Sequence, residues 1–149
     1  MTDAPPAPRP DLETIRGWAG DQLDELGGGK VGRIVAAMVD ERSGEPEWLL
    51  ARMGRFGHHT LVPSRDAVAG VGRVWVPYTR DQIRAAPRIE PGEPLTVAVE
   101  RALLEHYRVA VDPERATELG ERPLDAFSAR PAAVLSGRDS GSQSAVARL

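Results

Sequence analysis

Apolar, β-branched stretches alternate with glycine-rich turns in the first half of the chain. Residues 30–40 (KVGRIVAAMVD) form the clearest such stretch, and turn signals bound it on both sides. Residues 47–53 (EWLLARM) follow a turn at 41–46 in which Gly44 can adopt a positive φ without steric cost. The pattern therefore predicts a β-hairpin with its loop at 41–46.

Two further segments are predicted to be strands, and each carries a proline. Residues 59–63 (HTLVP) are short and apolar, whereas residues 73–78 (RVWVPY) alternate between two faces. Proline has no N–H to donate to a neighbouring strand, so Pro63 predicts a strand end or an edge, and Pro77 predicts an edge strand. Residues 21–24 are a weaker candidate for a strand.

Helical signals follow the strands. A capping box at Thr79 predicts a helix that ends before Pro87. Residues 95–109 place apolar side chains along one stripe and make the strongest helix of the chain, while Asp112 is a candidate N-cap for a second helix at 113–120. Because strands come first and helices later, we expect a mainly β fold with accessory helices rather than alternating βαβ units.

These elements divide the chain into four parts. Residues 1–11 are a flexible, proline-rich leader, residues 12–90 are a β-rich domain, and residues 91–121 are a helical extension. Residues 122–149 contain a small, polar run that cannot bury enough apolar area to offset the entropy lost on ordering. We therefore expect residues 122–149 to be a disordered tail.

Several short motifs follow one another along residues 14–107. They are KVGRI at 30–34, VDERSGEPEWL at 39–49, LVP at 61–63, VWVPY at 74–78, DQI at 81–83, AP at 86–87 and EHY at 105–107, preceded by GW at 17–18. In this order and spacing they resemble the PRC-barrel family, in particular its actinobacterial members. The resemblance implies a small PRC-like β-barrel over residues 12–90, followed by one or two helices, with apolar strand residues filling the barrel interior.

The resemblance also implies a kind of function. Related modules occur in the H subunit of photosynthetic reaction centres and in the C-terminal half of the ribosome maturation factor, where they act as protein-binding or scaffold modules without catalysis. We therefore expect a non-catalytic protein-interaction or scaffold module, whose partner is another protein or a second copy of the chain. The alternative, by resemblance to the maturation factor, is an RNA- or ribosome-associated factor.

The amino-acid composition narrows the possible classes of function further. The 149 residues include no cysteine, which excludes disulfides, thiolate catalysis and cysteine-based metal sites and makes a cytoplasmic location the default expectation. A net charge of −3 is unusual for a non-specific nucleic-acid binder. No apolar run is long enough to span a bilayer, so no membrane span is expected.

The motifs that could indicate catalysis or ligand binding each lack a residue or a spacing that the function requires. The GGGK run at 27–30 is followed by a strand rather than by the Ser or Thr and helix of a phosphate-binding loop. His58 and His59 are adjacent on a strand and so point to opposite faces, and Asp40 and Glu45 do not have the spacing of a calcium loop. We therefore predict no catalytic residues, no metal and no cofactor, and we expect that the protein is not an enzyme.

The candidate partner-binding residues are aromatic or basic: Trp75, Arg73, Tyr78 and Phe56. Trp, Tyr and Arg dominate interface hot spots, and Trp75 shares a face of its predicted strand with Arg73. Core packing is the competing interpretation for the aromatic side chains. The RNA alternative rests on five arginines that would form one basic face, namely Arg52, Arg55, Arg65, Arg73 and Arg80, with Phe56 and Trp75 as stacking surfaces.

Overall fold

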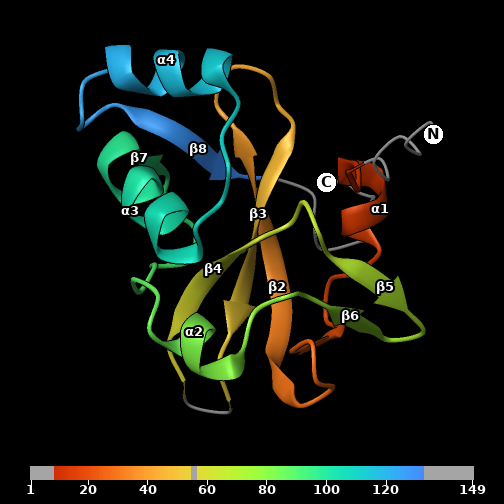
Figure 1. Cartoon of the computed structure of the whole chain (residues 1–149). Helices are drawn as coiled ribbons and strands as arrows, with labels where there is room; N and C mark the ends of the chain where they lie inside the picture. The colour runs from red at the N-terminus through yellow and green to blue at the C-terminus, as the bar shows by residue number, and fades with distance from the viewer. Residues whose placement is uncertain (1–8, 55–56, 133–149) are drawn as a thin grey trace, which may run out of the picture.

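The structure, a computed structural model, describes residues 9–54 and 57–132. In this part eight strands form one sheet, and four short helices lie around it (Figure 1). The strands are β1 (Gln22–Asp24), β2 (Lys30–Asp40), β3 (Pro46–Arg52), β4 (His59–Pro63), β5 (Val68–Gly70), β6 (Arg73–Trp75), β7 (Leu95–Thr96) and β8 (Phe127–Pro131). The helices are α1 (Leu12–Arg16), α2 (Arg80–Arg84), α3 (Val97–Tyr107) and α4 (Pro113–Glu121).

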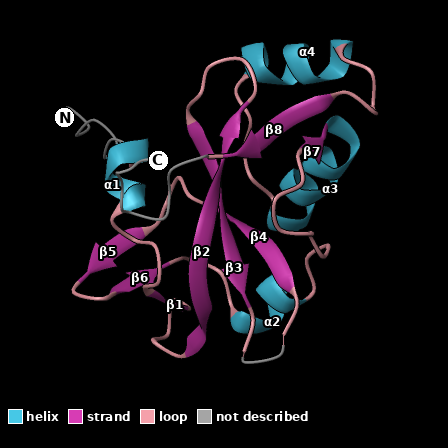
Figure 2. Ribbon diagram, turned by 180° about the vertical axis from the view of Figure 1, so that it is seen from behind, coloured by secondary structure: helices cyan, strands magenta, loops and turns pink. Residues whose placement is uncertain are grey.

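The long strand β2 is the centre of the sheet. One of its edges pairs with β3 in antiparallel fashion, which confirms the predicted hairpin. Its other edge pairs with β1 near the start of β2 and with β8 near the end. The register with β3 shifts at Ile34/Ala36 and at Met38/Val39, and such irregularities bend and twist a strand. This allows one strand to serve three neighbours that run in different directions (Figure 2).

The sheet is mixed and open. Its strands follow the order β4-β3-β2-β1-β6-β5, with β8 also on β2 and β7 on β8. All pairs are antiparallel except β1–β6. Among the described residues β4 and β5 do not pair with each other, so the sheet is not closed. The mainly β fold with accessory helices is confirmed, whereas the closed barrel is not.

One apolar core joins the sheet to the helices. Ile15 of α1, Ile83 of α2 and Leu103 of α3 are fully buried against the same cluster of strand residues. Tyr107, at the end of α3, donates its hydroxyl to the carbonyl oxygen of Leu61 in β4 at 2.8 Å. The core therefore extends from α1 through the sheet to α3.

The expected start of the disordered tail at residue 122 is wrong. Phe127–Pro131 forms β8, so residues 122–132 are not part of a disordered tail; residues 133–149 lie outside the described residues. The segment forms a strand because the end of β2 leaves its hydrogen-bonding groups free on that edge, and because Ser128 and Ala129 are small enough to be buried there. The expected helical extension at 91–121 contains α3 and α4 together with the short strand β7, and α3 packs on the common core.

The edge position expected for the strand at 73–78 is also wrong. The strand β6 comprises only residues 73–75 and lies between β1 and β5. Pro77 follows the end of β6, so its missing N–H does not weaken the pairing. The expected helix at 95–109 begins two residues late, because Leu95–Thr96 pairs with β8 before Thr96 caps α3.

Gly32 provides a test of the β2–β3 packing. A Cβ at this position would lie 2.1 Å from the carbonyl oxygen of Arg52 on β3. We expect Gly32→Ala to lower the free energy of unfolding by about 3 kcal/mol, because the two strands must move apart. Gly27→Ala, at a position where a Cβ meets nothing within 4 Å, is the control. Equal midpoints for the two variants in urea denaturation would contradict the observed hairpin.

Candidate functional site

Three arginines line up across the sheet. Arg52 of β3 pairs in register with Arg33 of β2, Arg33 pairs with Gln22 of β1, and Gln22 pairs with Arg73 of β6. Residues that pair directly across strands share a face of the sheet. The three arginines are exposed and Gln22 is half-buried. We call these four residues the arginine row.

Part of the arginine row carries positive charge without a counter-ion. Arg33 and Arg52 are opposite each other on neighbouring strands, an arrangement that is unfavourable for like charges. Lys30 joins them around a surface hollow of 220 Å³ that Gly32 and Gly54 complete. Among the described residues no carboxylate forms an ion pair with these three cations. Such a surface attracts anionic groups.

The side chain of Arg73, at the end of the arginine row, is held in place by a buried carboxylate. Its Nη1 lies 3.3 Å from Oδ2 of Asp24, and the side-chain amide of Gln22 donates to Oδ1 of Asp24 at 2.7 Å. Asp24 is fully buried, so it fixes both side chains at the surface. Trp75 follows Arg73 on the same side of β6, and its ring lies over Gly70, where a Cβ would come within 2.6 Å.

The strand next to Trp75 has an open edge. Within residues 9–54 and 57–132, β5 pairs only with β6. All three of its residues are exposed, including the apolar Val68, and so is Val71 in the following turn. The opposite end of the sheet is protected, because Thr60 of β4 forms a bridge with Arg88 and donates its hydroxyl to the carbonyl oxygen of Pro87. β5 is therefore an accessible edge beside Arg73 and Trp75.

The structure brings together only part of the predicted partner-binding set. Arg73 and Trp75 lie side by side, as expected from their alternation. Tyr78 lies elsewhere: it is half-buried, and its ring meets that of Tyr107 edge-on with centroids 4.8 Å apart. Phe56 lies outside the described residues.

The predicted basic face is also only partly present. Arg52 and Arg73 belong to the arginine row, but Arg65 points away and donates to the carbonyl oxygen of Ala110 at 2.7 Å. Arg80 begins α2, and Arg55 lies outside the described residues. Arg33 was not predicted as a member of this face. The signal for it in the sequence is a single charged residue in the interior of an apolar strand.

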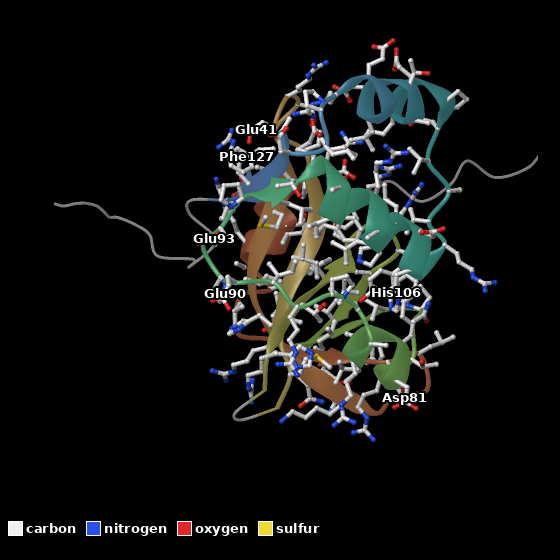
Figure 3. The ribbon with its side chains drawn as sticks, turned by 90° about the vertical axis from the view of Figure 1, so that its left-hand side faces the viewer. Glu41, Asp81, Glu90, Glu93, His106 and Phe127 are labelled. Atoms are coloured by element: carbon white, nitrogen blue, oxygen red, sulfur yellow. The ribbon has the colours of Figure 1, made fainter. Side chains whose placement is uncertain are left out.

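A second cluster of charges lies at the other end of β2. Arg115 of α4 contacts Oδ1 of Asp40 and lies 2.8 Å from Oε2 of Glu100 on α3. Both carboxylates are buried. Burial raises the pKa of Asp40, but the hydrogen bond and charge of Arg115, together with the backbone N–H of Ser43, outweigh it and hold that pKa below its ordinary value. Figure 3 places Glu41, the neighbour of Asp40, near α4, and Asp81 of α2 at the opposite end of the molecule.

A cavity of 90 Å³ adjoins this cluster. It lies between the start of β3, the end of β4 and residues 109–112, which connect α3 to α4. Glu47, Trp48, Glu100 and Arg115 line it. Oε1 of Glu100 and Nε1 of Trp48 are buried and have no hydrogen-bond partner among the described residues. Burial raises the pKa of Glu47, and the nearby charge of Arg115 offsets this only in part.

In residues 9–54 and 57–132 no three acidic or histidine side chains are grouped so that they could hold a metal ion. None of the helices in this part is both long and apolar enough to cross a bilayer. No protein-family model matches the chain, and no curated protein matches it significantly. The resemblance to the PRC-barrel family therefore stays a prediction.

Arg115 provides a test of the buried cluster. Removing it leaves Asp40 and Glu100 buried without a counter-ion, so we expect Arg115→Ala to lower the free energy of unfolding by about 3–5 kcal/mol. Arg101→Ala, which truncates an exposed arginine on α3, should change it by less than about 0.5 kcal/mol. Comparable unfolding midpoints for the two variants would contradict the role of Arg115.

The pKa of Asp40 predicts how stability depends on pH. Because this pKa is lower in the folded protein than the ordinary value of 3.8, the unfolded chain binds more protons in acid. The contribution of Asp40 is therefore present above about pH 4 and is lost as the pH falls further. Urea titrations between about pH 5 and pH 3 should give a smaller loss of stability for Asp40→Asn than for the wild type. Parallel pH profiles for the two proteins would refute the prediction.

Proposed function

We propose that the chain is a non-catalytic protein-interaction module of the PRC-barrel type, and that it binds an extended, acidic segment of a partner protein. The binding surface consists of the arginine row, Trp75 and the free edge of β5. The observation that carries the proposal is the alignment of Arg52, Arg33 and Arg73 across four strands that lead to an accessible strand edge.

An extended peptide matches this surface in two ways. The free edge of β5 offers backbone N–H and C=O groups to which another strand can add. Side chains of an added strand alternate between two faces, so every second residue would lie on the face of Arg73 and Trp75. Acidic side chains on that face would lie toward Arg73, the member of the arginine row nearest to this edge. The exposed Val68 and Val71 would bury apolar surface against the partner.

A peptide suits the surface better than RNA does. Strand addition requires a polypeptide backbone, whereas single-stranded RNA is usually held by several aromatic side chains that stack on bases. Trp75 is the one aromatic side chain next to the described part of the arginine row. The net charge of −3 also opposes long-range attraction of a polyanion. RNA binding is therefore the second candidate function, after peptide binding.

The proposal predicts selective binding of an acidic strand-forming peptide. Fluorescence anisotropy can compare an alternating Glu-Val peptide, a matched Lys-Val peptide and an oligouridylate RNA. We expect the Glu-Val peptide to bind most tightly at low salt. Arg33→Gln combined with Arg52→Gln should weaken it severalfold, because the two substitutions lower the positive potential that attracts the peptide to this face.

Substitution at the strand edge separates the two kinds of partner. Val68→Lys keeps the local charge positive but protects the edge of β5 from pairing, so it should weaken peptide binding and leave RNA binding intact. Leu124→Lys is the matched control, since Leu124 is 57% exposed and Val68 62%. Tight oligouridylate binding that Val68→Lys does not change would favour the RNA alternative over the proposed peptide partner.

A further inference from the structure

We propose that the hollow between Lys30, Arg33 and Arg52 binds a phosphate dianion, either free or as a phosphomonoester. The hollow lies at the start of β2, at the end of the molecule opposite α4 (Figure 2). The strands β1 and β6 separate it from β5, so the inference goes beyond the proposed peptide-binding function and does not rest on it. Three properties of the hollow support it: the charge of the lining, the position of the two arginines, and the open space between them.

The lining of the hollow is positive. Lys30, Arg33 and Arg52 line it, and the other two lining residues are Gly32 and Gly54. Among the described residues, none of the three cations forms an ion pair with a carboxylate. No acidic side chain from the described part of the chain lines the hollow. An anion is therefore attracted by three uncompensated charges and meets no repulsion from the lining.

The two arginines are placed to contact one ligand from two sides. Arg33 and Arg52 are directly opposite each other on β2 and β3, a relation that sets Cβ atoms roughly 4.5–5.5 Å apart. Nη1 of Arg33 donates to the carbonyl oxygen of Gly20 at 2.9 Å. This hydrogen bond fixes the guanidinium but leaves its charge uncompensated and its other N–H groups available. An anion shared by the two arginines would replace their mutual repulsion by two attractions.

The space between these side chains is open. Gly54, in the turn after β3, has a φ of 70°, and a Cβ there would meet nothing within 4 Å. The hollow has a volume of 220 Å³, many times the roughly 10–15 Å³ that one water molecule requires. The backbone of residues 27–29 does not line it. Recognition would therefore come from side chains and not from the backbone amides of a phosphate-binding loop.

The number of charges favours a phosphate dianion over other anions. A phosphomonoester carries about −1.5 to −2 charges at pH 7 and offers three acceptor oxygens. Arginine binds phosphate through two parallel hydrogen bonds, and lysine adds a compact charge. A carboxylate or a phosphodiester carries a single negative charge and would leave most of the positive charge of the hollow uncompensated. We therefore expect the site to prefer phosphate and its monoesters to both.

The experiment uses Lys30, which is the only lysine in the sequence. Reductive methylation with ¹³C-formaldehyde labels Lys30 and the terminal amine and keeps their charge. Lys30→Arg assigns the two NMR signals. Inorganic phosphate, methyl phosphate, dimethyl phosphate and acetate are titrated at pH 7.5 and constant ionic strength.

We expect phosphate and methyl phosphate to shift the Lys30 signal saturably and to leave the signal of the terminal amine in place. Dimethyl phosphate and acetate, which carry one charge each, should bind about tenfold more weakly. Tighter binding of methyl phosphate than of inorganic phosphate would identify an ester as the ligand, and the reverse order would identify the free ion.

Matched variants test the two arginines through the same Lys30 signal. Arg33→Gln and Arg52→Gln should each weaken methyl phosphate binding about tenfold. Arg101→Gln, which removes an exposed arginine from α3, should leave the affinity unchanged. Because Arg33 and Arg52 are exposed, neither substitution should lower the midpoint of urea denaturation, so a loss of binding can be assigned to the lost contact.

Three results would overturn the proposal. The first is a Lys30 signal that does not shift up to about 100 mM methyl phosphate. The second is equal binding of methyl phosphate, dimethyl phosphate and acetate, since the hollow would then attract any anion without selecting a dianion. The third is equal affinity of the Arg33→Gln and Arg101→Gln variants. None of these measurements includes a peptide, so failure of the phosphate site is distinguishable from failure of peptide binding.

Discussion

The fold depends on the pairing of β2 along both of its edges. β3 occupies one edge, while β1 and β8 divide the other edge between the two ends of the strand. An eleven-residue strand is about 35 Å long when fully extended, so its ends can carry separate surfaces. Lys30 and Arg33 at the start belong to an exposed basic surface, and Asp40 at the end belongs to a buried ion cluster. The same strand therefore fixes both candidate sites.

Elements that depend on neighbours in sequence could be predicted, and those that depend on distant partners could not. The hairpin follows from its strand pattern and turn, and the N-caps Thr79 and Asp112 follow from side chains that bond an amide three residues later. By contrast, residues 127–131 have little apolar character of their own. They form β8 because the distant strand β2 leaves an edge free and Leu95 of β7 pairs on their other side.

The same distinction explains which site residues were predicted. Alternation along a single strand is enough to place Arg73 beside Trp75. The alignment of Arg33 with Arg52 and Gln22 depends on cross-strand register, which the sequence does not show. Glu100 lies outside the main apolar stripe of its helix, yet it is buried, because Arg115 packs against it from the next helix.

The arginine row and the buried cluster of Arg115, Asp40 and Glu100 differ in how much free energy their unsatisfied polar groups cost. Arg33 and Arg52 repel each other in water, where salt screens the interaction, so the arrangement is tolerable without a partner and an anionic segment relieves it. The unpaired Oε1 of Glu100 is buried, where neither water nor salt compensates fully. Occupancy of the arginine row should therefore depend on ionic strength. The stability of the buried cluster should instead depend on the hydrogen bond and charge that Arg115 supplies to Glu100, which salt screens much less.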